Sequence, residues 1–209
     1  IDFRNDGAGQ LIGWRWAWEA KQDELLDQPV AKSEISDWKP TSFDYPRFLG
    51  NGYWPEATGI ELATDWEREP PQEVWRRPIG AGWAGFAVVG DYAITQEQRG
   101  NSELVTCYSV STGEPVWVHS DEIRFDPQDV QGNLGGVGPR ATPTIHENRV
   151  YTQGATGIIN CLDARTGDVL WSHDVEKEFE IPTLVWGKSG SPLVIPDLGI
   201  VVVNLGAPP

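Results

Sequence analysis

Residues 107–117, CYSVSTGEPVW, recur at residues 161–171 as CLDARTGDVLW. Cys, Thr, Gly and Trp stand at the same four positions in both copies. A chain that repeats a segment at a period of about 50 residues builds the same supersecondary unit more than once. This duplication therefore favours a repeat architecture, in which neighbouring units bury each other's faces.

Three copies of a strand–turn–strand pattern surround the duplicated segment. They occupy residues 84–96 (AGFAVVGDYAITQ), 140–153 (RATPTIHENRVYTQ) and 190–203 (GSPLVIPDLGIVVV). Each copy places two short apolar runs around a turn of Gly, Asp, Asn or Pro. In the first two copies a third strand then ends at the Cys, and a fourth ends at the Trp. The sequence therefore predicts units of four short antiparallel strands, the pattern of a β-propeller blade.

The Thr-Gly pair within the duplicated segment predicts a turn between the third and fourth strands. Gly supplies the positive φ that such a turn needs, and the carboxylate of Asp163 is expected to cap its turn. The Trp at the end of the fourth strand is expected to close the seam between two blades. The residues assigned to this structural repeat are Thr112, Gly113, Trp117, Asp163, Thr166, Gly167 and Trp171.

Residues 1–66 do not match the repeat, and we interpret them as a non-repeat N-terminal extension. Within them WRWAW, residues 14–18, has the period of two that predicts a strand. Residues 67–209 hold about three blades, the last truncated, whereas closed rings have 4–8. We therefore expect further blades from the rest of a longer chain or from another chain. The absence of Met likewise indicates that residue 1 is not the start of translation.

The charge balance disfavours some classes of partner. The chain has 31 acidic and 16 basic residues, a net charge of −15. Because nucleic acids are bound mainly through clustered Lys and Arg, we expect no nucleic-acid partner. No apolar run reaches the roughly 18–20 residues of a membrane span. Cys107 and Cys161 lie one repeat apart, usually beyond disulfide reach, and are predicted to be buried thiols.

The segment LDARTGDVLW, residues 162–171, resembles the tryptophan-docking signature of the PQQ-type (pyrroloquinoline quinone) propeller repeat. The earlier copy departs from the signature at Ser109, where Asp is usual. Residues 43–209, with GPRATPTI and SGSPLV, resemble a bacterial group of extracytoplasmic PQQ-like propeller proteins, often described as BamB-like. The resemblance implies an all-β fold of four-stranded PQQ-like blades. It also implies a location outside the cytoplasm, in the periplasm or anchored to a membrane.

The resemblance leaves three functions open. The first is a non-enzymatic scaffold that binds a protein partner or a small ligand through one face or the central channel, with no cofactor. The second is a quinoprotein alcohol dehydrogenase, a family that uses PQQ with calcium, an adjacent Cys pair and an Asp base. Cys107 and Cys161 are not adjacent and no Asp stands in a matching motif, so no catalytic residue is assigned. The third is a ligand-sensing domain of a larger protein.

The first strand of each propeller blade lines the channel, which makes residues 136–143 and 187–192 channel-facing loops. An anionic or polyhydroxylated ligand could bind there, since Arg presents a planar fork to carboxylates. The competing interpretation is that the Arg pairs with an acidic side chain and the hydroxyls bond to backbone. The candidate ligand-binding residues are Arg140, Thr142, Lys188, Ser189 and Ser191.

Two further features have mainly structural interpretations. Residues 95–103, TQEQRGNSE, are interpreted as a hairpin tip that is a solvated turn or, alternatively, a loop that contacts a partner. The three His lack the Cys/His spacing of a zinc site, so no metal site is predicted.

Overall fold

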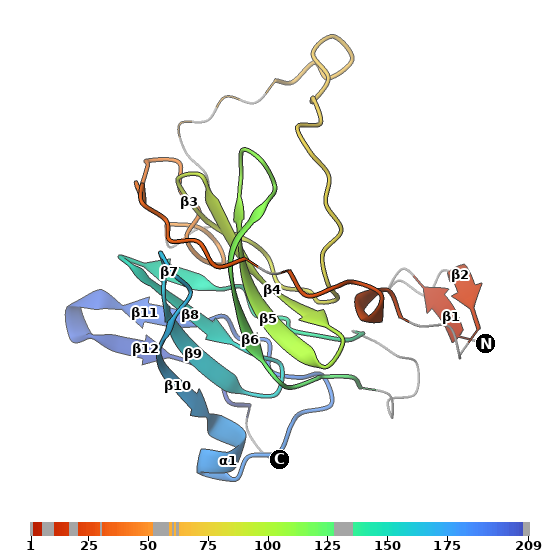
Figure 1. Cartoon of the computed structure of the whole chain (residues 1–209), viewed down its shortest axis with the longest axis vertical. Helices are drawn as coiled ribbons and strands as arrows, with labels where there is room; N and C mark the ends of the chain where they lie inside the picture. Colours follow the sequence, from red (N-terminus) through yellow and green to blue (C-terminus); the bar gives the residue numbers. More distant parts are fainter. Residues whose placement is uncertain are drawn as a thin grey trace.

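Two four-stranded antiparallel sheets, each made of consecutive strands, form the centre of the fold (Figure 1). The first, blade 1, contains β3 (Ala87–Val89), β4 (Tyr92–Arg99), β5 (Ser102–Ser109) and β6 (Pro115–Asp121). The second, blade 2, contains β7 (Thr144–His146), β8 (Arg149–Gln153), β9 (Ile158–Asp163) and β10 (Val169–Asp174). This computed structural model describes residues 2–5, 11–16, 21–29, 31–51, 59, 61, 63–127 and 136–206. The predicted all-β fold of four-stranded antiparallel blades is confirmed.

The third copy of the repeat is a hairpin of two strands. It pairs β11 (Leu193–Ile195) with β12 (Ile200–Val202) around the short 3-10 helix η2 (Pro196–Leu198). The helix α1 (Val175–Phe179) connects blade 2 to this hairpin, and no helix in the described part of the chain is long and apolar enough to cross a membrane. The remaining elements are β1 (Asp2–Asn5), β2 (Leu11–Arg15) and η1 (Gln22–Glu24).

The predicted strand at residues 14–18 is present only in part. The strand β2 ends at Arg15, and Trp14 and Trp16 meet edge to face with their ring centroids 5.4 Å apart. Trp18 lies outside the described residues.

Tryptophan side chains join each blade to the next at the Thr-Gly turn. Trp117 in β6 is fully buried, and its Nε1 donates to the carbonyl of Ala164 at 3.0 Å. Its ring lies directly on Gly167, where φ is +73° and a Cβ would fall 2.5 Å from Cε3 of the ring. Trp75 repeats this arrangement one blade earlier. Its Nε1 donates to the carbonyl of Val110 at 2.7 Å and its ring covers Gly113.

A buried cluster fills the seam between blades 1 and 2. Trp117 is its largest side chain, and the thiol of Cys107 is buried within it and free. Cys161, one blade on, is likewise buried and free. Trp171 has the repeat position of Trp117 but remains 38% exposed, in contact with Tyr151 and His173.

Glutamine side chains form a second, polar connection between the blades. Gln96 of β4 donates through Nε2 to the carbonyl of Ala141 at 2.6 Å and to that of Gln153 at 3.4 Å. Gln153 of β8, at the equivalent position, donates through Nε2 to the carbonyl of Asn204 at 2.7 Å. The Thr-Gln pair that ends two of the aligned copies in the sequence therefore contributes a repeated contact between blades.

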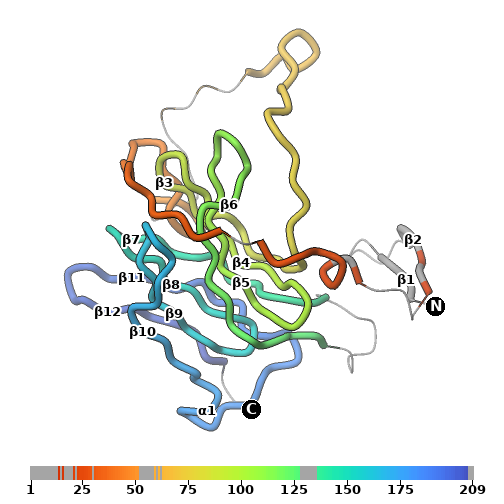
Figure 2. The backbone as a smooth tube through the Cα atoms, viewed as in Figure 1, coloured from red at the N-terminus to blue at the C-terminus, as the bar shows by residue number. Residues whose placement is uncertain are grey.

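Residues 21–29 and 31–51 form a segment, here called the strap, that wraps around blade 1. Figure 2 follows it from η1, past β6, to the vicinity of β3. On the outer side, the amide of Ser33 donates to the carbonyl of Val116 at 2.9 Å. On the inner side, Tyr45 and Val88 of β3 exchange two backbone hydrogen bonds of 2.9 and 2.8 Å. The strap therefore pairs with both edge strands of blade 1, β6 and β3.

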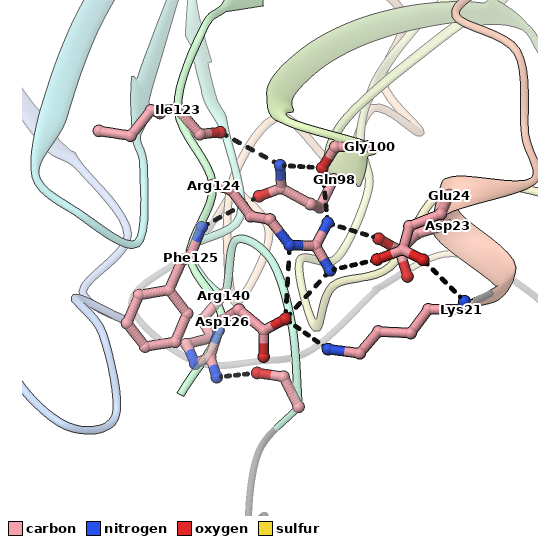
Figure 3. A network of polar contacts seen from close by, with 11 residues as sticks. Lys21, Asp23, Glu24, Gln98, Gly100, Ile123, Arg124, Phe125, Asp126 and Arg140 are labelled. Atoms are coloured by element: carbon pink, nitrogen blue, oxygen red, sulfur yellow. Dashed lines mark hydrogen bonds and ion pairs between the residues drawn. The ribbon is translucent and has the colours of Figure 1, made fainter. Parts of the chain in front are cut away.

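An ion-pair network anchors the start of the strap (Figure 3). Arg124, in the connection after β6, donates to Asp23 at 2.7 Å and to Asp126 at 3.2 Å. Lys21 forms an ion pair with the same Asp126. Asp23 is only 5% exposed, so this pair is less screened by solvent than a surface ion pair.

The interpretation of residues 95–103 as a solvated turn is wrong. Glu97 and Gln98 are fully buried, because β4 and β5 extend to the tip and their side chains enter the seams on both faces. Glu97 accepts hydrogen bonds from Thr106 Oγ1 at 2.8 Å and from Tyr108 Oη at 2.6 Å. Burial alone would raise the pKa of Glu97, but the hydrogen bonds from Tyr108 and Arg99 outweigh it and hold the pKa below its ordinary value.

Candidate functional site

The innermost strands β3, β7 and β11 lie in succession and contact one another, which defines the axial side of the blades. Two hydroxyls predicted to face a ligand connect these strands. The amide of Gly85 donates to Thr142 Oγ1 at 3.0 Å, and the amide of Thr142 donates to Ser191 Oγ at 3.0 Å. Each hydroxyl thus accepts a bond from the preceding blade, and satisfies a backbone group there.

Lys188 forms a buried ion pair with the helix α1. Its side chain has no exposed surface, and Nζ lies 2.7 Å from Glu176 Oε1 in α1. Its aliphatic carbons pack 3.0 Å from where a Cβ would stand at Gly157. Its amide donates to the carbonyl of Ala155 at 2.8 Å. Lys188 therefore ties α1 to the β8–β9 turn.

Arg140 is half-buried in a site formed by its own loop and by Phe125 (Figure 3). The guanidinium lies 4.4 Å from the centroid of the Phe125 ring, within cation–π range. It donates to the carbonyl of Gly136 at 2.7 Å and to that of Gly138. Burial lowers the pKa of Arg140 below its ordinary value, and the nearby carboxyl of Glu103 partly opposes that shift.

The five candidate ligand-binding residues therefore do not form one cluster. Thr142 and Ser191 are hydrogen-bonded to each other, Arg140 lies over Phe125, and Lys188 pairs with α1. Ser189 is exposed.

A cavity of about 260 Å³ opens on the axial side between the strap and the strands β7 and β11. Its walls are mostly apolar, and Phe48, Leu49 and Leu193 are 59%, 41% and 45% exposed. Of the five candidates from the sequence, Ser191 lines it, and its hydroxyl oxygen already accepts a hydrogen bond from the amide of Thr142. The lining residues are Arg47, Phe48, Leu49, Thr144, Ser191, Pro192 and Leu193.

Sequence reasoning missed the strap's part of this cavity. The segment YPRFLG, residues 45–50, lies in the non-repeat extension, to which the sequence assigned no binding residue. No local pattern in it indicates pairing with strands about 40–100 residues away. The one signal available is its density of aromatic and aliphatic side chains between Pro and Gly, which usually need burial or a partner.

A pair of carboxyl groups, one buried and one half-buried, lies at the seam of blades 1 and 2. Glu103 of β5, 5% exposed, accepts a 3.0 Å hydrogen bond from the amide of Ala155 and is the register partner of the half-buried Asp121 on the neighbouring strand β6. Desolvation raises the pKa of Glu103 to about 7, and the charge of Asp121 adds to the shift. Asp121 is held at 2.7 Å by Asn160 Nδ2 of blade 2.

The seam site is suited to packing and not to chemistry on a substrate. A pKa near 7 is that of a general base, but the second carboxyl oxygen of Glu103 lies so close to Gly154 that a Cβ there would collide. In the described part of the chain, no three or more His, Cys, Asp or Glu side chains are grouped so that they could hold a metal ion. The axial cavity is therefore the candidate binding site.

Comparison with known proteins identifies the repeat. Residues 66–204 match a family model described as outer membrane protein assembly factor BamB. No curated protein sequence matches the chain.

Two solved structures are similar over part of their length. BamB from Moraxella catarrhalis has 19% identity and a TM-score of 0.34, over 53% of this chain and 27% of that one. A europium-containing methanol dehydrogenase has 20% identity and a TM-score of 0.38, over 57% of this chain and 20% of that one. The chain thus spans about a quarter of the length of these structures or less, and similarity of this extent says nothing about its activity.

Proposed function

Because the chain belongs to the PQQ-like repeat family whose model is described as outer membrane protein assembly factor BamB, we propose that it is a non-enzymatic extracytoplasmic scaffold. In this proposal it binds a protein partner through the axial side of its blades. The observation that carries the proposal is the apolar axial cavity, whose rim exposes Phe48, Leu49 and Leu193.

A protein partner fits this surface better than a polyhydroxylated small molecule. A polar ligand would need a free cation and free acceptors, yet Lys188 is paired with Glu176, and Thr142 and Ser191 each already accept a hydrogen bond from a backbone amide. Breaking such a bond leaves a buried polar group unsatisfied, at a cost of about 1–3 kcal/mol. Covering the exposed apolar side chains with a partner, in contrast, removes them from water and stabilises the complex.

The proposal includes further blades that pack on the side of Trp171. The supporting observation is that Trp117, at the same repeat position, is fully buried by the next blade, while Trp171 is 38% exposed. A following Thr-Gly turn would bury Trp171 in the same way. A native mass spectrum of the protein purified from its source tests this point, and a lone chain of 23.2 kDa would contradict it.

Photo-crosslinking in the cells that make the protein tests the scaffold role. Phe48 is replaced by p-benzoylphenylalanine, and the control variant carries the same group at Leu198, which is 67% exposed but lies in η2, outside the cavity lining. A discrete protein adduct at Phe48 and none at Leu198 is expected, with the adduct recovered from the extracytoplasmic fraction. Equal or absent adducts at both positions would refute the proposal.

The enzymatic alternative has its own assay. The purified protein is supplied with PQQ, calcium and a primary alcohol, and reduction of an artificial dye is followed. We expect no turnover above the rate without protein. Dye reduction that depends on both PQQ and protein would show that the protein is a quinoprotein dehydrogenase and would refute the non-enzymatic function.

A further inference from the structure

We propose that the axial edge of β11 binds an extended peptide segment as an added antiparallel strand, with an apolar side chain in the neighbouring cavity and basic residues beside it. The inference rests on the scaffold function and names the chemistry of the partner.

The first argument is that the axial edges of the two preceding blades already pair with extended chain. The middle residue of β3, Val88, donates to and accepts from Tyr45. The middle residue of β7, Ile145, donates to the carbonyl of Pro46 at 2.7 Å. In both hairpins this middle residue belongs to a non-hydrogen-bonded pair, so its N–H and C=O point away from the neighbouring strand. The strap binds these outward-pointing backbone groups.

The second argument is that β11 offers the same groups without such a partner. Val194 is the middle residue of β11 and pairs with Val201, as Val88 pairs with Ala93. By the same alternation, its N–H and C=O point away from β12. Within the described residues, the strap forms no backbone hydrogen bond with Val194. An edge that the described residues leave unpaired in this way is a template for another strand.

The strap ends its axial course just before β11. Leu49 and Gly50 both have positive φ, +69° and +76°, and the amide of Gly50 donates back to the carbonyl of Arg47 at 2.9 Å. A Cβ at Gly50 would lie 2.7 Å from the ring of Tyr45, so the chain folds back on itself here. The turn leaves the edge of β11 uncovered by the strap.

The axial cavity provides a place for one anchoring side chain beside this edge. Leu193 and Pro192, which precede Val194, line the cavity together with Phe48 and Leu49. A volume of about 260 Å³ is smaller than a drug-sized pocket of roughly 300–1,000 Å³ and suits a single large apolar side chain. Strand addition supplies affinity through the main chain, and such a pocket supplies selectivity.

The charge of the chain decides between occupants. With a net charge of −15, a second copy of this chain would be repelled, whereas a peptide with Lys or Arg beside its apolar anchor is attracted. Arg47 is the one charged residue among those lining the cavity, so the partner segment is expected to be apolar at its centre, which enters the cavity, and to carry its basic residues on both sides, outside it.

The test uses a synthetic peptide, Lys-Val-Leu-Val-Lys, acetylated and amidated at its ends, with binding followed by titration calorimetry. Val194→Pro removes the N–H that points away from β12, so no hydrogen bond between β11 and β12 is lost. Pro is tolerated at such an edge position. Leu193→Asn places an uncharged polar side chain in the cavity and leaves the net charge unchanged. Each variant is expected to weaken binding at least about tenfold, whereas the control Leu198→Asn leaves it unchanged. Thermal unfolding of each variant verifies that it is folded.

A second peptide, methylated on the central backbone nitrogens, distinguishes strand addition from apolar contact alone, and it is expected not to bind. Equal binding of the two peptides, undiminished binding by both Leu193→Asn and Val194→Pro, or no binding of the unmodified peptide at all would overturn the inference. If the Phe48 adduct forms in cells while the peptide does not bind, the scaffold function stands and only the strand addition fails. If neither is observed, both fail.

Discussion

Replacing Glu103 by Gln tests the physical account of the seam between blades 1 and 2. The carboxyl is 5% exposed and accepts one hydrogen bond, from the amide of Ala155. Burial raises its pKa from 4.5 to about 7. The folded state therefore holds a proton on Glu103 between these values, while the unfolded state releases it.

The sign and size of the effect follow from this difference. A raised pKa in the folded state gives a contribution to stability that is present below pH 4.5 and is lost as pH rises through about 7. Applied between pH 5 and 8.5, the linkage relation gives a loss of roughly 2.5 kcal/mol. The substituted amide side chain is uncharged at both pH values and keeps a carbonyl oxygen for the amide of Ala155. The substitution should therefore remove this loss.

The assay is urea unfolding followed by tryptophan fluorescence across that pH range. The free energy of unfolding of Glu103→Gln, relative to the natural protein, is expected to rise by roughly 2.5 kcal/mol from pH 5 to 8.5. The control Glu69→Gln alters an exposed carboxyl and should give parallel profiles. If Glu103→Gln also runs parallel to the natural protein, Glu103 is ionised in the folded state near pH 5 and the argument from burial is refuted.

Three further predictions concern the tryptophan seam. Trp117→Ala should lower the free energy of unfolding by about 3–5 kcal/mol, since the ring is fully buried, whereas Trp171→Ala should cost clearly less in the same denaturant titration. Gly167→Ala should destabilise by at least about 1 kcal/mol, because φ there is +73° and the Trp117 ring occupies the space of a Cβ; a neutral effect would contradict the docking geometry. Cys107, buried and with its pKa raised by desolvation, should not react with a thiol reagent until the protein unfolds, and fast labelling of the native protein would contradict its placement.

The blades themselves could be predicted because their determinants are local. The turn at Gly167 and the Trp four residues later are close in sequence, and their recurrence reveals the period without any knowledge of tertiary contacts. Even the cap predicted at Asp163 is present, since its carboxylate accepts from the amides of Arg165 and Thr166 at 2.8 and 3.2 Å.

The polar tip and the strap could not be predicted by the same means. Residues 95–103 have the composition of a solvated turn, and only the opposing strands reveal that Glu97 enters a seam. The backbone pairing of Tyr45 with Val88 joins two segments whose sequences share no repeat or periodicity, so nothing in the sequence indicates that they meet. The hydroxyls of Thr142 and Ser191 illustrate the same limit, because residue type alone cannot distinguish an acceptor for a ligand from an acceptor for a neighbouring blade.

The strap also affects the order in which tertiary contacts can form during synthesis. Arg165 donates to the carbonyl of Ile35 across 130 positions of sequence, so this contact cannot form until its second partner has been synthesised. At roughly 5–20 residues per second, the emerging chain carries the strap without that partner for about 10 s. Ile35, only 2% exposed in the folded protein, therefore acquires this contact after Val88 and Val116, the strap's pairing partners in blade 1, have been made. Attachment of the strap to blade 2 is a late event of biosynthesis, although the strap's residues are among the first translated of those described.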